Sequence, residues 1–270
     1  MDLTAITAVI TDIAYPLLVA MSVGMARAMG MIMLTPAFMR LGLTGMLRSA
    51  VAFAIALPVV PTVFVTLGTD AMPGAVDLAG LVIKEMCIGA VIGIAFGIPF
   101  WAAETAGELI DLQRGSTMSQ LVDPLSSGES SVTATMLSIT IVALFFTSGG
   151  FLFLLGAFYG SYDLWPAISF MPVMTKAAPA AILSVLDRIM QVALVLTGPV
   201  VIAILIVDVM MAFLSRMAPQ LHVFDLSLAV KNLLYSLLIV LYLQFLTPLM
   251  FDQIAGLQGG LDMLRRTIAP

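Results

Sequence analysis

The sequence Gly107-Glu108-Leu109-Ile110-Asp111-Leu112-Gln113-Arg114-Gly115 is a polar, glycine-punctuated segment between two long apolar segments. It continues through Met118 to Asp123-Pro124-Leu125. Because the protein is 61% hydrophobic and only 10% charged, such a polar interruption needs a physical reason. Backbone that is not helical cannot face lipid, since its N–H and C=O groups would lack hydrogen-bond partners there. We therefore expect the segment to lie in water, in protein or along a cavity, and to be the first place to look for function.

The composition on both sides of this segment predicts a polytopic α-helical membrane protein. Mean hydropathy over the 270 residues is +1.13, whereas ordinary soluble domains are roughly 45–50% apolar. Several apolar blocks approach or exceed the ~20 residues that a helix needs to cross the bilayer core. The blocks are Ile13–Leu34, Val51–Leu67, Leu78–Trp101, Val132–Tyr159, Leu183–Leu214 and Leu226–Phe251. The alternating segments of about ten residues that build a β-barrel are absent, so the predicted class is all-α.

Glycine and proline interrupt most of the apolar blocks. The interruptions are Pro58 with Pro61, Gly149-Gly150, Gly198-Pro199 and Pro248. Membrane helices tolerate such residues when neighbouring protein satisfies the freed backbone groups. The pattern predicts interrupted helices packed in an assembly, and we take residues 1–270 as a single membrane domain. No Lys or Arg precedes Arg27, so a cleavable signal peptide is not expected.

A glycine stripe lies in the third block, where Gly89, Gly93 and Gly97 recur every four residues. Glycines at this spacing share one helical face and let another helix backbone approach closely. The stripe predicts a tight helix–helix contact without identifying the second helix. The block is also expected to continue as a polar helix towards Asp111.

Acidic residues occur both on one face of the third helix and deep within the fifth apolar block. Glu104, Glu108 and Asp111 share one helical face, which we interpret as solvated in preference to a cation site or pore lining, with Arg114 neutralising part of it. Asp208 lies deep in the fifth block, where an unpaired carboxylate costs at least a few kcal/mol.

Asp208 is interpreted as half of a structural ion pair between helices, with a proton or ion relay as the alternative. Its candidate partners are Arg27, Lys84 and Arg216. Arg216 also suits the C-terminal end of a helix, where a cation meets the negative end of the dipole. We assign Asp208 and Arg216, together with the glycine stripe, to packing and assembly.

Enzymatic chemistry is not predicted. The chain has one histidine, His222, which we interpret as structural, and one cysteine, Cys87, which cannot form an internal disulfide. Neither a Gly-x-Ser-x-Gly elbow nor a Walker A loop is present. The net charge of −5 is diffuse and no basic patch suggests nucleic acid. We therefore expect no catalytic residues, no cofactor, no metal site and no nucleic-acid partner.

Three polar stretches carry a resemblance to a known family. They are Asp111–Gly115 with Asp123–Gly128, Gly149-Gly150 with Ser161–Pro166, and Arg216–Phe224 with Ser227-Leu228 and Lys231. Their order and spacing, across roughly residues 105 to 235, resemble the SctT family of type III secretion export-gate proteins, also called YscT, SpaR or HrcT and related to flagellar FliR. The motif Asp-Leu-Gln-Arg-Gly, together with the later motif Arg-x-Ala-Pro-Gln, favours the injectisome branch over the flagellar one.

The resemblance implies a non-enzymatic subunit of a protein-export channel. Such a subunit is a multi-pass protein of the bacterial inner membrane, all-α, with interrupted helices that form helical hairpins in a hetero-oligomeric export gate. Its partners would be SctR and SctS (FliP and FliQ in flagella), with SctU (FlhB-like) associated, and exported proteins would be its substrates. Much of the complex would be raised out of the bilayer towards the periplasm.

The resemblance also implies that one segment plugs the closed channel. Its residues are Leu112, Gln113, Arg114, Gly115, Ser116 and Met118. The polar members suit a wet lumen, and the two large apolar members can seal against neighbours. Gly107 and Gly115 are expected to let the backbone bend at both ends.

Two other classes of function remain open. Interrupted helices and Asp208 also suit a small-solute secondary transporter, although transporters often show inverted repeats and none is evident here. The second alternative is a passive assembly scaffold that never contacts a lumen.

Overall fold

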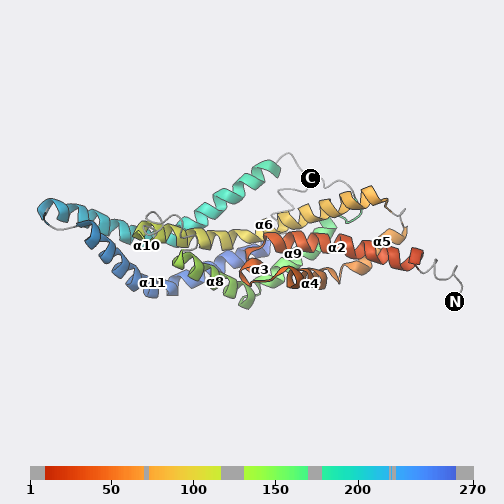
Figure 1. Cartoon of the computed structure of the whole chain (residues 1–270), viewed down its shortest axis with the longest axis horizontal. Coiled ribbons are helices and arrows are strands. Elements are labelled where there is room, and N and C mark those ends of the chain that lie inside the picture. The colour runs from red at the N-terminus through yellow and green to blue at the C-terminus, as the bar shows by residue number, and fades with distance from the viewer. Residues whose placement is uncertain are drawn as a thin grey trace. The chain divides into compact units, whose positions relative to one another are not determined.

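The computed structural model of the chain describes residues 10–69, 73–116, 131–169, 178–218, 220 and 223–259. Helices joined by turns make up this part of the chain, which contains no strand (Figure 1). Four helices within it are long and apolar enough to cross a membrane, or up to six spans if each of two bent helix pairs counts as one. The predicted all-α, polytopic class is confirmed.

The helices begin and end close to the predicted apolar blocks. In chain order they are η1 (Ile10–Ala14), α2 (Tyr15–Leu34), α3 (Pro36–Arg40), α4 (Gly45–Ala56), α5 (Val60–Thr69), α6 (Ala75–Arg114), α8 (Val132–Thr147), α9 (Gly150–Leu164), α10 (Ala178–Met217), α11 (Val223–Ala255) and η2 (Gly256–Gly259). Helix α6 therefore continues through the polar segment to Arg114, further than the predicted end near Asp111.

Only some of the predicted interruptions end a helix. Helices α4 and α5 meet at a bend of 66° beside Pro58. Gly149 separates α8 from α9 in a left-handed conformation (φ +82°), which glycine adopts without a Cβ clash. In contrast, α10 and α11 continue through Pro199 and Pro248, so the interruptions expected there are wrong. A proline frees one carbonyl in a membrane helix, which neighbouring groups can satisfy without ending it.

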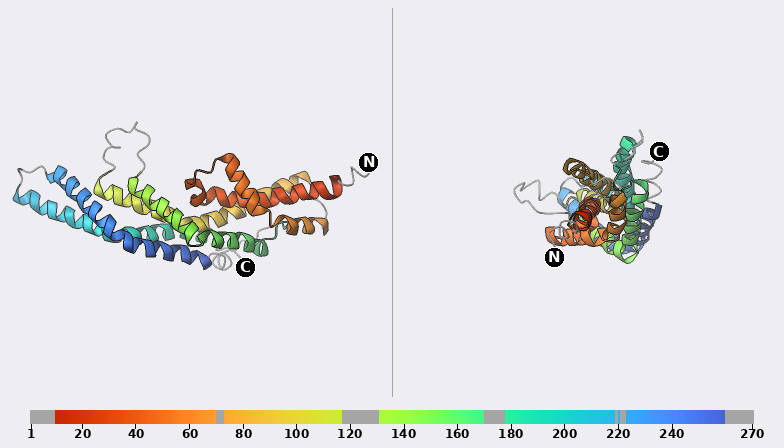
Figure 2. Two further views of the ribbon diagram at one scale, coloured as in Figure 1. Left: turned by 90° about the horizontal axis from the view of Figure 1, so that it is seen from below. Right: turned by 90° about the vertical axis from the view of Figure 1, so that its right-hand side faces the viewer.

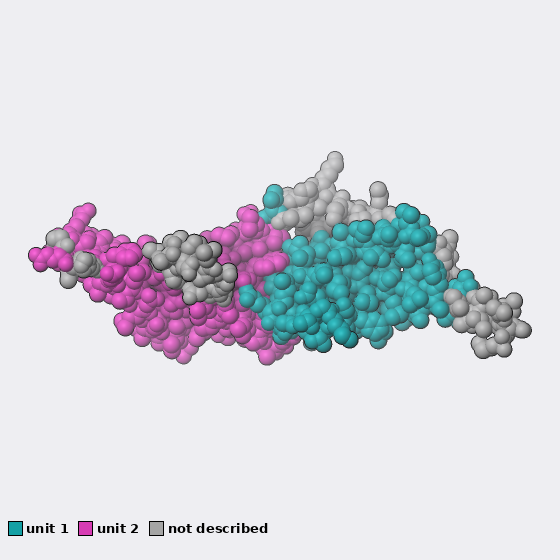
Figure 3. Space-filling model, viewed as in Figure 1, with its two compact units in different colours: residues 1–97, 149–183, 256–270 teal, residues 98–148, 184–255 magenta. Residues whose placement is uncertain are grey.

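The chain divides into two compact units, drawn in different colours in Figure 3. Unit 1 comprises Met1–Gly97, Gly149–Leu183 and Gly256–Pro270, and unit 2 comprises Ile98–Ser148 and Ser184–Ala255. Helix α6 contributes its first part to unit 1 and its last part to unit 2. That residues 1–270 act as one membrane domain stays a prediction.

In unit 1, the glycine stripe of α6 packs against α2. A Cβ added at Gly89 would lie 1.9 Å from the Arg27 carbonyl oxygen, and one at Gly93 would lie 2.6 Å from the Met31 carbonyl oxygen. The contact is reciprocal, because a Cβ at Gly30 of α2 would lie 2.2 Å from the Met86 carbonyl oxygen. Gly97, one turn further along α6, is buried. The second helix that the sequence left unidentified is α2.

In unit 2, the end of α6 packs against three other helices. Ile110 of α6 forms a buried cluster with Val200 and Ile204 of α10 and Tyr235 of α11. The paths of α10 and α11 can be followed in Figure 2. A Cβ at Gly107 would lie 2.2 Å from the Ala134 Cα atom, so the backbones of α6 and α8 touch. The bend predicted at Gly107 is therefore wrong, since this glycine lies inside a helix and serves a close approach.

Candidate functional site

The predicted plug segment begins as helix and leaves it at Gly115. Residues 112–114 form the last turn of α6, and Gly115 follows in a left-handed conformation with φ +77°. The Gly115 amide donates to the Leu112 carbonyl oxygen at 3.1 Å, and the Ser116 amide donates to that of Asp111 at 3.1 Å. A glycine just past the last helical residue ends helices in this way, so the bend expected at Gly115 is present. Met118 lies outside the described residues, as does His222.

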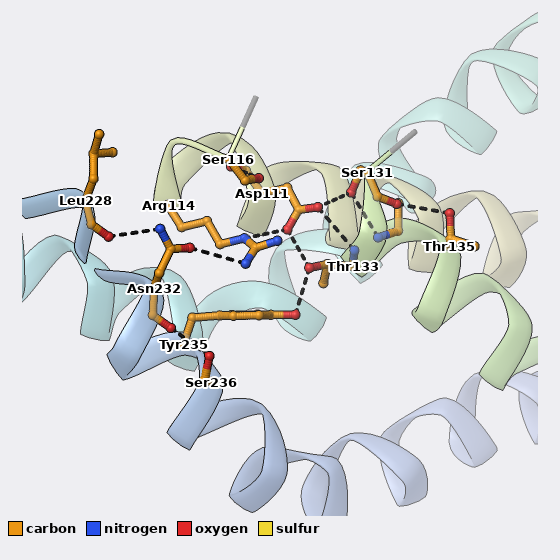
Figure 4. A network of polar contacts seen from close by, with 11 residues as sticks. Asp111, Arg114, Ser116, Ser131, Thr133, Thr135, Leu228, Asn232, Tyr235 and Ser236 are labelled. Atoms are coloured by element: carbon orange, nitrogen blue, oxygen red, sulfur yellow. Dashed lines mark hydrogen bonds and ion pairs between the residues drawn. The ribbon is translucent and has the colours of Figure 1, made fainter. Parts of the chain in front are cut away.

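Asp111 is the centre of a polar network (Figure 4), and its side chain is buried. The Ser131 hydroxyl and the Thr133 amide donate to Oδ2 at 2.6 and 3.1 Å. The Arg114 Nε donates to Oδ1 at 2.8 Å, and the Thr133 hydroxyl donates to the same oxygen. The prediction of a solvated carboxylate face is therefore wrong for Asp111, although Glu108 is exposed. The serine and threonine donors come from the start of α8, at least 20 residues away, where sequence spacing gives no sign of them.

The direction of each hydrogen bond in the network follows from the chemistry of Asp111. An ionised carboxylate only accepts, so the Thr133 hydroxyl uses its single proton towards Asp111. The Tyr235 hydroxyl, 2.7 Å from the Thr133 hydroxyl, must then donate to Thr133. Asp111 in α6, Thr133 in α8 and Tyr235 in α11 thus form one directed chain (Figure 4).

Arg114 ties the end of α6 to α11. Besides its bond to Asp111, it donates through Nη1 to Asn232 Oδ1 at 3.3 Å. Its guanidinium lies over the Tyr235 ring, 4.3 Å from the centroid, a favourable cation–π arrangement. The Asn232 side chain is itself oriented by a bond to the Leu228 carbonyl oxygen at 2.9 Å. The predicted neutralisation of Asp111 by Arg114 is confirmed.

Both ends of the chain between α6 and α8 are bonded to Asp111. After α6, the Ser116 hydroxyl donates to the Asp111 backbone carbonyl at 3.0 Å. Before α8, Ser131 caps the helix by accepting from the Ala134 amide at 3.0 Å while donating to the Asp111 carboxylate. We call Asp111, Arg114, Ser131, Thr133 and Tyr235 the clasp. Sequence reasoning singled out only its first two members.

Asp208 pairs with Lys231 of α11, at 2.5 Å between Oδ1 and Nζ. Lys231 Nζ also donates to the Gln113 carbonyl oxygen at 3.4 Å, at the end of α6. The ion pair between helices is confirmed, but all three suggested partners are wrong. Arg27 and Lys84 contact another acid, described next, and Arg216 is exposed in the last turn of α10. The pairing depends on how α11 aligns with α10, which sequence spacing does not give.

Unit 1 holds a second polar cluster, around Glu85. Both Glu85 and Arg27 are fully buried, and Arg27 binds the carboxylate through two nitrogens, at 2.6 and 2.9 Å. Lys84 Nζ lies 2.8 Å from Glu85 Oε1. Sequence reasoning missed Glu85, although it precedes Gly89 by four residues and so shares the face that meets α2. In the described part of the chain, no group of three or more His, Cys, Asp or Glu residues is placed to hold a metal ion.

Comparison with known proteins places this chain among bacterial exporters. The family model described as "Bacterial export proteins, family 1" matches residues 18–257. The chain is 36% identical over 197 residues to Yop proteins translocation protein T of Yersinia pestis, covering 73% of this chain and 75% of that protein. It is 31% identical over 234 residues to Surface presentation of antigens protein SpaR of Salmonella typhimurium, covering 86% of each. Flagellar biosynthetic protein FliR of Escherichia coli is 31% identical over 144 residues, 53% of this chain and 54% of that protein.

Proposed function

The chain belongs to the bacterial export proteins, family 1, and on this premise we propose that it is a core subunit of a type III secretion export gate. It helps to build and to plug the channel through which unfolded proteins leave the cell. The observation that carries the proposal is the family match across residues 18–257, which includes every helix of the clasp. The helices that are long and apolar enough to span a membrane suit a multi-pass protein of the inner membrane.

The injectisome branch is favoured over the flagellar one. The relatives named for Yop translocation and for surface presentation of antigens align over 73% and 86% of this chain, whereas the FliR relative aligns over 53%. The alternative is a flagellar export-gate subunit. The proposed role is structural, with no catalysis by this chain.

The proposed partners are SctR and SctS, which resemble flagellar FliP and FliQ, and SctU, which resembles FlhB. Large apolar side chains are exposed along α10 and α11, among them Leu194, Ile202, Phe213 and Phe245. Such faces suit neighbouring subunits or lipid. We further propose that part of the assembled gate is raised towards the periplasm.

The plug segment is proposed to be Leu112, Gln113, Arg114, Gly115, Ser116 and Met118. In support, the Leu112 side chain is 64% exposed although it lies in the last turn of a membrane-length helix. Ser116 is also exposed, just past the turn at Gly115. An exposed apolar side chain close to an exposed polar one suits a seal that faces a wet lumen.

Site-specific crosslinking tests this function. With a photo-crosslinking residue at Leu112 and an exported substrate stalled in transit, we expect a covalent adduct between the subunit and the substrate. Leu152 of α9, which is 68% exposed, is the matched control position and should give no adduct. A stalled substrate that reacts at neither position, in a complex that secretes normally, would favour a passive scaffold without lumen contact.

Removing the ion pair between α10 and α11 is expected to weaken assembly more than gating. Asp208→Asn leaves Lys231 without its carboxylate, so the yield of assembled complex should fall. The effect should be modest, because the Asp208 side chain is 35% exposed and partly exposed pairs contribute about 1 kcal/mol or less.

The exchange Asp208→Lys with Lys231→Asp re-forms the pair and should recover much of the yield. Asp187→Asn, an exposed acid on the same helix, is the matched control. Normal yield of the Asp208→Asn complex together with lost secretion would reverse the expected order of effects. Co-purification and secretion are measured on the same strains.

A further inference from the structure

We propose that Asp111 is a positioning residue, which fastens the two ends of the 116–131 connection to each other and is itself held by α11. The inference rests on the proposed function, in which this connection begins within the plug segment. It concerns only the described residues at the two ends, Ser116 and Ser131, and the helices that carry them.

The acceptor positions of the Asp111 carboxylate are all occupied. It accepts four hydrogen bonds, from Arg114, the Ser131 hydroxyl, and both the amide and the hydroxyl of Thr133. A carboxylate offers about four acceptor positions and no proton, so it fits this set of donors. An asparagine would turn an NH2 group towards groups that also donate. Asp111→Asn therefore breaks the clasp although it hardly changes the size of the side chain.

The hydrogen bonds of Ser116 and Ser131 to Asp111 hold the two ends of the connection together. The chain between Ser116 and Ser131 has fourteen residues, and its two ends are bonded to the same residue, one to its carbonyl and one to its carboxylate. Fixing both ends of a connection removes conformations in which those ends separate. A single side chain thereby sets where the connection leaves α6 and where it enters α8.

Helix α11, which is not part of the connection or of the two helices that it joins, also holds the clasp. The Tyr235 hydroxyl donates to Thr133, and the Tyr235 ring lies beneath the Arg114 guanidinium. Lys231, one turn earlier on α11, reaches the Gln113 carbonyl oxygen and Asp208 of α10. A shift of α11 away from the end of α6 would remove the donor to the Thr133 hydroxyl and the donor to the Gln113 carbonyl oxygen, the residues on either side of the Asp111 contacts. Movement of this helix and loosening of the clasp are therefore coupled.

The clasp is separable from the fold of unit 2. One turn before Asp111, the backbones of α6 and α8 already touch at Gly107 and Ala134. Ile110 remains in the buried cluster with α10 and α11. Loss of the clasp should therefore loosen the last turn of α6 and the first turn of α8 while the helices stay packed.

The test measures the separation of the two ends directly. Cys87, the only cysteine, is replaced by serine, and spin labels are placed at Leu112 and Val132, whose side chains are 64% and 73% exposed. In the complex purified with its partner subunits, we expect one narrow distance distribution. Asp111→Asn should broaden it, and Tyr235→Phe, which keeps the ring but removes the donor to Thr133, should broaden it less.

Three further variants make the result specific. Glu108→Gln removes an exposed carboxylate one turn earlier on α6 and should leave the distribution narrow. If Asp111→Asn does not assemble, Thr133→Val takes its place, with Thr140→Val as control because that hydroxyl bonds only within its own helix. A distribution that stays narrow in Asp111→Asn, or in Thr133→Val where that replaces it, overturns the proposal.

Ion conductance separates this inference from the proposed function. In reconstituted complexes, Asp111→Asn should raise the leak of the closed gate about tenfold or more, because charged hydrogen bonds are lost. A broadened distribution without any leak would support the clasp and count against the plugging role. An unchanged distribution with increased leak would support plugging and overturn the clasp.

Discussion

Glu85→Gln is expected to lower the free energy of unfolding by about 3–5 kcal/mol, the usual effect of removing one partner from a buried ion pair. The Glu85 side chain is fully buried and contacts two cations, Arg27 and Lys84. Arg27 is itself fully buried and Lys84 is 9% exposed. The substitution leaves both charges without a carboxylate inside unit 1.

The remaining contacts of the two cations show why they cannot simply turn to solvent. Arg27 also donates to the Ser161 hydroxyl and to the Trp165 carbonyl oxygen, each at 2.8 Å. Its guanidinium lies 3.6 Å from the centroid of the Tyr162 ring. Lys84 donates to the carbonyl oxygens of residues 166, 167 and 169 at 2.9 to 3.1 Å. Both side chains are anchored at the end of α9 or in the segment that follows it, so the charge stays buried.

Unfolding of the detergent-solubilised protein, followed by tryptophan fluorescence, measures the effect. Trp165 is 5% exposed and adjoins the cluster, so its emission reports on this site. Glu108→Gln, the same chemical change at an exposed position of α6, should shift the transition little. Adding Arg27→Met to Glu85→Gln removes one uncompensated cation and should recover part of the loss. Equal stability of Glu85→Gln and the unsubstituted protein would contradict the account.

Local features of the sequence were enough to predict the helices and two of their breaks, beside Pro58 and at Gly149. Gly149 ends a helix because its left-handed conformation excludes other residues, and this requirement shows in the sequence as Gly149-Gly150. Pro199 and Pro248 looked equivalent but lie inside continuous helices. A proline ends a membrane helix only if its freed carbonyl finds no partner, and the sequence does not show the neighbours.

Of the contacts in the candidate site, only those between residues of one helix could be predicted from the sequence. Arg114 follows Asp111 by three residues, so their ion pair follows from helical spacing. Ser131, Thr133 and Tyr235 come from two other helices, and their approach to Asp111 depends on how those helices align. For the same reason Lys231 was overlooked as the partner of Asp208. Pairings within a helix can be predicted from a single sequence, whereas pairings between long helices require the fold.

The same alanine substitution should have opposite effects at two helical glycines. At Gly89 a Cβ would lie 1.9 Å from the Arg27 carbonyl oxygen and 2.9 Å from the Met31 amide nitrogen. Both atoms belong to the backbone of α2 and cannot rotate away, so Gly89→Ala must push α2 from α6. At Gly156 of α9, the added Cβ would meet no atom within 4 Å among the described residues, apart from its own stretch of helix. Gly156→Ala should leave stability unchanged or raise it by up to about 1 kcal/mol, the helix-propensity difference.

The displacement caused by Gly89→Ala extends beyond the glycine contact itself. Glu85 lies one turn before Gly89 on the same face of α6, and its partner Arg27 is the residue whose carbonyl the new methyl group would meet. Separating the two backbones therefore also lengthens the buried ion pair, and overpacking alone already costs about 1–3 kcal/mol. We expect the unfolding transition of Gly89→Ala to fall well below that of Gly156→Ala, measured side by side by tryptophan fluorescence. Coincident transitions would show that α2 and α6 do not pack through this stripe.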